Sequence, residues 1–309
     1  MARYLAGRLA QAVSVAIGVT FVIFSAVFLL PGNPAAALDG GQPMSSATLH
    51  AITVAYGLNQ PFIIQYGRYA VGLLHGDLGI SISTGQSVAS LIGQTWPVTA
   101  TLALTVWAVE IIVGVGSGVV AAARRGQAFD RLVQAGSVLL VCVPVFVAAY
   151  TSQVLLGIRL HWLPVTGTAT GWPASYLLPA SVLAMSGIGA IARLTRATML
   201  EELRQGYVRT AVAIGLPWRL VVARHTLRNA LVPVITCLGT DLGVLLSGAV
   251  VVESVFNLPG VGLLAYNAVQ NKDGTVVVGV VTMLVLVFLV ANLLVDVLAA
   301  ALDPRIRYR

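Results

Sequence analysis

Long apolar runs alternate with short polar segments along this chain. Five runs of 20 or more mostly apolar residues lie near 9–30, 96–123, 132–158, 230–252 and 275–300, and a less apolar sixth lies near 177–198. Each run is long enough to cross a hydrocarbon core of about 30 Å as an α-helix. The pattern predicts an all-α integral membrane protein, with six transmembrane helices in one domain covering residues 1–309.

Composition supports a membrane protein and changes the interpretation of the first run. The chain of 309 residues is 58% hydrophobic and 9% charged, with a mean hydropathy of +0.90, whereas soluble domains are about 25% charged. The first run, near small residues at 35–37, resembles a secretory signal peptide. It exceeds the roughly 7–15 apolar residues of such a signal, and five more runs follow. We therefore expect it to remain as a membrane anchor.

The basic residues indicate the orientation of the chain. By the positive-inside rule, the side of the membrane that carries most arginines is cytoplasmic. Here 15 of the 18 basic residues fall on one side, which predicts a multi-pass protein of the cytoplasmic membrane with both termini in the cytoplasm. The arginines on the cytoplasmic side of the membrane then account for the net charge of +7. We therefore expect membrane lipid, and no nucleic acid, as a partner. The 15 residues are Arg3, Arg8, Arg124, Arg125, Arg131, Arg193, Arg196, Arg204, Arg209, Arg219, Arg224, Arg228, Arg305, Arg307 and Arg309.

An extracytoplasmic insertion is predicted at residues 31–95, because a simple connection would not need this length. We expect one short helix over residues 46–56, capped by Ser46, and a second from Phe62 to Leu74 that begins at Pro61. Glycines 76 and 79 predict the turn that ends it. The insertion is either a spacer on the membrane surface or a surface for docking and funnelling a substrate. Both interpretations remain open.

Small residues inside the runs predict helix packing. Gly114 and Gly118 lie four residues apart, with Gly116 between them, and such a pair lets two helix backbones approach closely. Cys142 and Cys237 both fall inside predicted spans, where a cysteine packs as a small apolar residue. They indicate no disulfide framework.

A polar stretch at residues 201–228 interrupts the apolar pattern and lies in a predicted cytoplasmic loop, residues 199–230. Val208, Ala211, Val212 and Gly215 recur at helical spacing and predict a narrow stripe of small residues. Gly215 suits the left-handed conformation that ends a helix, and Pro217 suits the first turn of another. The stretch predicts a helix, a sharp corner and a second helix. An ordinary loop whose arginines only set topology is the alternative.

The run Arg209-Thr210-Ala211-x-x-x-Gly215 resembles the signature loop of importer-type ABC transporter permeases, Glu-Ala-Ala-x-x-x-Gly followed by nine residues and Ile-x-Leu-Pro. Arg209 and Thr210 depart from that pattern, and only Leu227 is kept in the later part. Residues 207–211 and 224–230 are instead similar to the dipeptide, oligopeptide and nickel branch. The resemblance covers nearly the whole chain and is to the first of two permease subunits. Further matching pieces are Pro31-Gly32-Asn33-Pro34, Tyr56-Gly57-Leu58-Asn59-Gln60-Pro61, Gly76-Asp77-Leu78-Gly79, Val252-Glu253-Ser254-Val255-Phe256, Leu258-Pro259-Gly260-Val261-Gly262, Asn292-Leu293-Leu294-Val295-Asp296 and Asp303-Pro304-Arg305-Ile306-Arg307.

The resemblance implies the type I importer permease fold and an assembly with a sister permease, two cytoplasmic ATPases and an extracytoplasmic solute-binding protein. ATP and magnesium would bind the ATPases, and this chain would bind no cofactor. In keeping with that, its only lysine, Lys272, lies in no phosphate-binding Gly-Lys-Ser/Thr motif. The loop would be a coupling helix seated on an ATPase. The ATPase-coupling residues implied are Tyr207, Arg209, Thr210, Ala211, Gly215, Leu216 and Pro217.

Four acidic residues lie in or near the predicted spans, where an ionised side chain facing lipid is costly. Asp241 and Glu253 are candidates for the translocation path, and Asp241 would attract the amino group of a peptide. Asp241 could equally be a structural carboxylate that is hydrogen-bonded to a neighbouring helix, and Glu253 could equally cap the turn that follows it. We expect Asp296 to pair with an arginine, and we assign Glu110 no role. The four histidines are scattered, so we expect no metal site.

The function implied is ATP-driven import of di- or oligopeptides by alternating access, with this chain as a pore subunit and not an enzyme. Import of a nickel chelate or of glutathione is the alternative within the same class. A stand-alone secondary transporter or channel is the alternative from another class. That alternative predicts inverted repeats with broken helices in both halves, and the sequence shows none.

Overall fold

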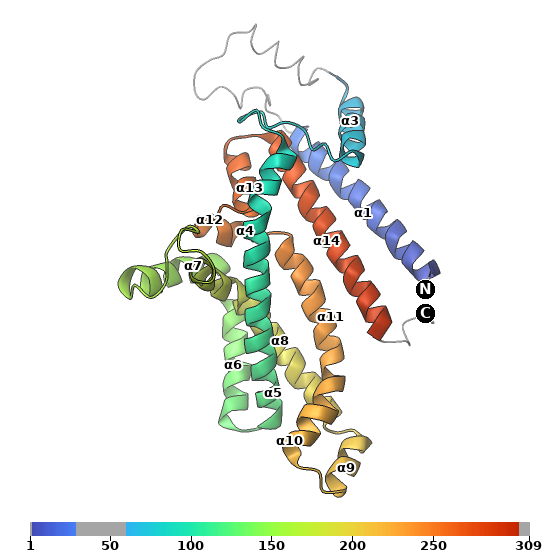
Figure 1. The fold of residues 1–309 in the computed structure, drawn as a ribbon, viewed down its shortest axis with the longest axis vertical. Helices are drawn as coiled ribbons and strands as arrows, with labels where there is room; N and C mark the ends of the chain where they lie inside the picture. The colour runs from blue at the N-terminus through green and yellow to red at the C-terminus, as the bar shows by residue number, and fades with distance from the viewer. Residues whose placement is uncertain (1, 29–59, 303–309) are drawn as a thin grey trace.

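The structure, a computed structural model, describes residues 2–28 and 60–302, and these are helical apart from turns and one isolated bridge between Ile80 and Ser87. The predicted helix over residues 46–56 and the basic residues Arg305, Arg307 and Arg309 near the C-terminus lie outside the described residues. Figure 1 shows the helices as a long bundle, with α3 near one end and α9 and α10 projecting from the other. We call these the α3 end and the α9 end.

The elements are α1 (Ala2–Phe28), α3 (Phe62–Leu74), α4 (Val88–Val109), η2 (Glu110–Val115), α5 (Gly116–Ala123), α6 (Ala128–Cys142), α7 (Val145–Ser152), η3 (Gln153–Arg159), α8 (Ala174–Glu202), α9 (Gly206–Ala213), α10 (Trp218–Leu220), η4 (Val221–Thr226), α11 (Leu227–Leu246), α12 (Val250–Val255), α13 (Val261–Gln270) and α14 (Gly274–Leu302).

The spans confirm the all-α membrane architecture and correct one predicted helix. Among the described residues, five helical stretches are long and apolar enough to cross a membrane, one of them continuous through α4, η2 and α5, and the pair α6 with α7–η3 makes a sixth if it counts as one span. That pair bends by 98° at a break after Cys142, so the continuous third span predicted over residues 132–158 is wrong. Val143 is extended because Pro144 follows it, and a residue before proline is pushed out of the helical region.

The structure also corrects two predicted span boundaries. The second span begins at Val88 rather than near residue 96, and Ser87 precedes it in an extended conformation. The fifth span ends at Leu246 rather than near residue 252, because Gly248 takes a φ of 100° and the chain restarts as the short helix α12. A left-handed glycine of this kind is a common way to end a helix.

Helix α8 lies at the centre of the bundle and packs against α4, η2, α5, α6 and α11. The predicted glycine packing is found here. Gly118 faces the Ala192 carbonyl oxygen and the Thr195 side chain, and Gly114 faces Ile191, while Gly116 faces open space. A Cβ at residue 118 would lie 2.7 Å from both the Ala192 oxygen and the Thr195 Cβ. The glycine pair, one residue in η2 and one in α5, thus lets both elements approach α8 closely.

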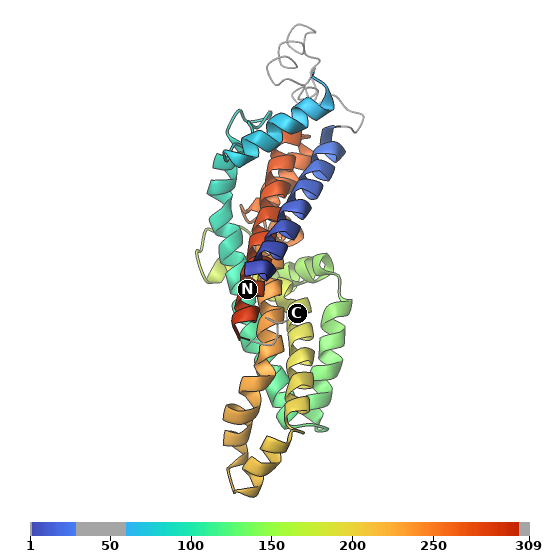
Figure 2. The same cartoon turned by 90° about the vertical axis from the view of Figure 1, so that its right-hand side faces the viewer.

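Helix α3, predicted from Phe62 to Leu74 and found there, lies across the α3 end of the bundle beside α1 and α14 (Figure 2). Phe21 and Phe24 of α1 pack against Phe62 and Tyr66, with ring centroids 5.2 to 5.9 Å apart. The Tyr69 hydroxyl donates to Thr282 Oγ1 of α14 at 2.7 Å. This part of the predicted insertion therefore packs against α1 and is hydrogen-bonded to α14.

Candidate coupling loop and intramembrane carboxyl groups

The predicted coupling loop forms a helical hairpin at the α9 end. Helix α9 ends in a Schellman motif, in which the Leu216 amide donates to the Ala211 oxygen at 3.2 Å and the Gly215 amide to the Val212 oxygen at 3.0 Å. Gly215 has a φ of 82°, as its predicted left-handed position requires. Pro217 then caps α10 from the preceding position instead of forming its first residue.

The small-residue stripe predicted on α9 divides between two environments. Val208 and Ala211 are buried against Val221, with Leu216 packed beside them, whereas Val212 and Gly215 are exposed. The buried half therefore joins α9 to η4 within this chain. Of the other predicted coupling residues, Arg209, Thr210 and Pro217 are exposed, and so is Tyr207.

Apolar side chains at the tip of the hairpin were not predicted as functional residues. Ile214, between α9 and Gly215, is 71% exposed, and Trp218 and Val212 are also exposed. The sequence pattern predicts Val212 on the packing stripe and assigns no role to Ile214 or Trp218. The available signal is the apolar character of Ile214 and Trp218 on either side of Gly215 and Pro217, because the turn at these two residues forms the tip of the hairpin.

Polar contacts hold the hairpin to the end of α8. The Tyr207 hydroxyl donates to Glu202 Oε2 and accepts from Asn229 Nδ2 of α11 at 3.2 Å. Burial, together with the hydrogen bond to Glu202, raises the pKa of Tyr207, so the phenol keeps its proton. Tyr207 thereby connects α8, α9 and α11.

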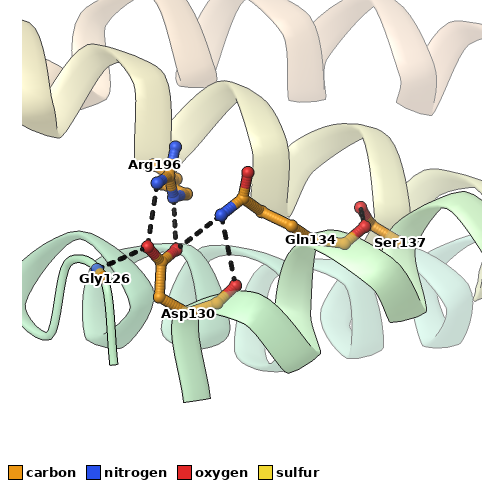
Figure 3. A network of polar contacts seen from close by, with 5 residues as sticks. All are labelled: Gly126, Asp130, Gln134, Ser137 and Arg196. Atoms are coloured by element: carbon orange, nitrogen blue, oxygen red, sulfur yellow. Dashed lines mark hydrogen bonds and ion pairs between the residues drawn. The ribbon is translucent and has the colours of Figure 1, made fainter. Parts of the chain in front are cut away.

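A buried carboxylate anchors the same end of α8 to α6 (Figure 3). Asp130 Oδ2 accepts from Arg196 Nη2 and from the Gly126 amide, both at 2.9 Å, and Arg196 Nε donates to Oδ1. Gln134 Nε2 also donates to Oδ1 at 3.2 Å. Two oxygens with four donors form a fully satisfied charge-assisted site. The network fixes the α5–α6 loop to the helix that leads into the hairpin.

Glu110 and Asp241 lie together inside the bundle. Glu110 is the first residue of the π-helix η2 and is 1% exposed, and its carboxyl group lies close to the Asp241 side chain of α11. The Trp107 indole donates to the Leu238 carbonyl oxygen at 3.0 Å close by. On another side of these helices, α4, α11 and α14 enclose an apolar cavity of about 530 Å³, lined in part by Trp107, Leu242 and Leu294.

Glu253, the other candidate for the translocation path, is fully buried, and both carboxyl oxygens accept hydrogen bonds. Thr99 Oγ1 donates to Oε1 at 2.8 Å, and the Gly262 and Leu263 amides donate to Oε2 at 2.7 and 3.1 Å. Thr99 Oγ1 also accepts from the Val261 amide. The carboxylate thus caps α13, which is the structural alternative considered for this residue.

Asp296 pairs with Arg8 of α1, with 3.3 Å between Oδ2 and Nε. The predicted arginine partner of Asp296 is therefore confirmed. In the described ranges, no group of three or more His, Cys, Asp or Glu side chains gathers as a metal site would require.

Comparisons with known proteins match these features over the whole chain. The family described as "Binding-protein-dependent transport system inner membrane component" matches residues 114–308, and its N-terminal companion matches residues 1–103. The dipeptide transport system permease protein DppB of Alkalihalophilus pseudofirmus is 35% identical over 337 residues and is aligned over 100% of both chains. The glutathione transport system permease protein GsiC of Escherichia coli is 36% identical over 311 residues, again over 100% of both chains.

A Brucella abortus protein, provisionally named a peptide transport system permease, is 41% identical over 307 residues, which are 97% of this chain and 98% of that protein. Among solved structures, a chain of the MetNI methionine ABC transporter in inward-facing conformations matches with a TM-score of 0.58 at 18% identity, over 69% of this chain and 96% of that chain. This structural likeness shows a shared fold. The chain belongs to the family of binding-protein-dependent transport system inner membrane components, as a multi-pass inner-membrane permease that works with an ATPase and a binding protein and is not itself the ATPase.

Proposed function

We propose that the chain is one of two membrane-spanning subunits of an ATP-driven importer that carries di- or oligopeptides into the cell by alternating access. The observation that carries this proposal is the full-length identity of 35% to the dipeptide permease and 41% to the Brucella protein. The glutathione permease, at 36%, makes glutathione, itself a small peptide, the second candidate substrate.

The proposed assembly contains a sister permease, two ATPases that bind ATP and magnesium, and an extracytoplasmic binding protein. The α9 end faces the cytoplasm and the α3 end faces the binding protein, with both chain termini in the cytoplasm. The arginines near the hairpin support this orientation, since Arg193, Arg204 and Arg209 all lie toward the α9 end. No cofactor is assigned to this chain.

The α9–α10 hairpin is the proposed coupling element. Exposed Ile214, Val212 and Trp218 form an apolar tip suited to an apolar groove on an ATPase, flanked by Arg209 and Thr210. The buried contact of Val208, Ala211 and Val221 makes the hairpin one rigid body. Because η4 continues directly into α11, a movement of the hairpin displaces that span.

Asp241 is the proposed residue of the translocation path. It borders the exposed face of α11 formed by Pro233, Thr236, Thr240 and Val244, a face that the sister permease would meet across the path. Glu253 acts on the path through its hold on α13 rather than by touching the substrate, since neither of its oxygens is free.

Reconstitution tests the proposed function. The chain is assembled with its sister permease, ATPases and binding protein in vesicles, and uptake of a labelled dipeptide is measured with and without ATP. We expect uptake that requires ATP and is stopped by vanadate, with weaker competition from glutathione than from unlabelled peptide. Uptake that proceeds without the ATPases would show a stand-alone transporter. ATP-dependent uptake of glutathione or a nickel chelate, but not of other peptides, would show that the proposed substrate is wrong and that the imported compound is the substrate.

A further inference from the structure

Glu110 and Asp241 face each other where no ordinary hydrogen-bond donor reaches them. Glu110 Oε2 and Asp241 Oδ2 are buried, and no N–H or O–H group of the described chain lies within hydrogen-bond reach of either oxygen. The two side chains nevertheless lie close enough to each other for a hydrogen bond. Two ionised carboxylates can only accept hydrogen bonds. A contact between them therefore needs a proton on one of the two groups.

No positive charge nearby allows both groups to ionise. Within the described ranges, the carboxylates that form ion pairs are Asp130 of α6 and Asp296 of α14, and neither Glu110 nor Asp241 has a cationic partner. The remaining titratable group close to the pair is the Cys237 thiol, one helical turn from Asp241. Two carboxyl groups that share one site at low dielectric retain at least one proton.

The surroundings are shaped around this contact. A Cβ on residue 187 of α8 would overlap the Glu110 carboxyl group, so Gly187 leaves the space that this side chain occupies. The π-helix η2 begins at Glu110 itself, and π-helical turns are frequent at functional sites. The hydrogen bond from Trp107 to the Leu238 oxygen holds α4 and α11 at this separation. Three helices thus meet at the pair.

We propose that Glu110 and Asp241 form a proton-binding site inside the membrane bundle, in which one shared proton joins η2 to α11. The shared proton itself does not depend on the proposed function, but its link to the conformational switch rests on the proposed role of the coupling hairpin. If the coupling hairpin displaces α11, the carboxyl groups separate, the O–H bond of the protonated group breaks, and the proton passes to water to leave a carboxylate. When the helices close again, a proton from water restores the pair. The conformational switch is then linked to pH, and alkaline conditions favour the separated state.

Infrared spectroscopy of the assembled transporter in nanodiscs tests the shared proton directly. At neutral pH we expect a carbonyl-stretch band of a protonated carboxylic acid that disappears in both Glu110→Gln and Asp241→Asn. The matched control is Asp296→Asn, which removes a carboxylate already paired with Arg8 and should leave the band unchanged. A band that persists in both single variants, or a wild-type spectrum without it, would overturn the proposal.

Thermal unfolding gives a second measurement. The wild-type unfolding midpoint should fall as pH rises into the alkaline range, because loss of the shared proton leaves two facing carboxylates. Glu110→Gln should flatten this dependence, since its amide donates to Asp241 at every pH, whereas Glu110→Ala should lower the midpoint throughout. Equal alkaline slopes in the wild type and Glu110→Gln would contradict the proposal. Both measurements are independent of peptide uptake, so failure of the proposed substrate would leave their results standing.

Discussion

Arg196 binds Asp130 through two nitrogens and so joins the last turns of α8 to the first turn of α6. Asp130 is almost fully buried and also accepts from the Gly126 amide, which draws the α5–α6 loop into the same contact (Figure 3). The hairpin leaves α8 just beyond Arg196. The contact therefore connects α6 to the part of α8 that leads into the hairpin.

The Asp130 variant should destabilise the protein. Asp130→Asn leaves the Arg196 guanidinium without its counter-charge, and removing one partner of a buried pair costs about 3–5 kcal/mol. Because the Arg196 side chain is 20% exposed, we expect the lower end, about 3 kcal/mol. The measurement is the thermal unfolding midpoint of the purified transporter. Arg124→Gln, at an exposed arginine of the same loop, is the control, and equal midpoints for the two variants would disprove the role of the pair.

The two glycines of α5 provide a matched comparison. Gly118→Val should lower both the unfolding midpoint and the yield of assembled transporter, because its Cβ would lie 2.7 Å from the Ala192 oxygen of α8. Gly116→Val has nothing within 4 Å of its Cβ, so it carries only the helix-propensity change that both variants share. Overpacking of this kind costs about 1–3 kcal/mol. Similar losses in both variants would mean that α5 and α8 do not pack closely here.

The hydrogen bonds to Asp273 lead us to expect that the protein loses stability in acid. Burial alone would raise its pKa, but hydrogen bonds from Ser81, Ser83 and the Val276 amide outweigh burial and lower the pKa. A carboxyl group with a lowered folded-state pKa stabilises the fold at pH above the unfolded-state value of about 3.9. That contribution is lost as pH falls through the folded-state pKa. We therefore expect the thermal unfolding midpoint to decrease when the pH is lowered below about 4.

The Asp273→Asn variant isolates this contribution. It should lower the midpoint at neutral pH, since the amide replaces one acceptor oxygen, and it should lose part of the acid-dependent drop. Ser83→Ala removes two side-chain contacts but keeps the amide of residue 83, so it should give an intermediate result. An acid profile that is identical in the wild type and in Asp273→Asn would assign the drop to other groups.

Gly215 tests the coupling hairpin. Gly215→Val should reduce the ratio of peptide transported to ATP hydrolysed, because a β-branched residue is strained at a φ of 82° and would distort the tip. Gly215→Asn should keep most coupling, since asparagine tolerates this conformation. Among the described residues, no atom lies within 4 Å of a Cβ added at Gly215, so the comparison separates the effect of backbone conformation from that of a steric clash. Full coupling in Gly215→Val, with the complex still assembled, would refute the role of the hairpin.

Most of the fold could be predicted from local signals. Span positions follow from the length of apolar runs, and the end of α9 follows from Gly215 and Pro217, whose backbone preferences are local. The break at Pro144 could not be predicted, because proline inside an apolar run is compatible with a kinked span. Whether the helix kinks or turns by 98° depends on what packs against it.

The candidate site was less predictable, because its contacts join distant parts of the chain. Glu110 carried no role in the sequence until its place beside Asp241 of α11 was known. Glu253 could be either a path residue or a cap, and the three donors around it come from both α4 and α13. On α9, helical spacing found Val208 and Ala211 but not the direction in which Val212 would face.

The hydrogen bond between the Trp107 indole and the Leu238 oxygen also provides an optical reporter. Of the five tryptophans, Trp162, Trp172 and Trp218 are exposed, whereas Trp107 lies where α4 meets α11. If the other four are replaced by phenylalanine, the tryptophan fluorescence of this chain comes from a single indole beside α11, the span that the hairpin is proposed to move. Its emission wavelength would record each opening and closing of the bundle in real time, without an attached dye.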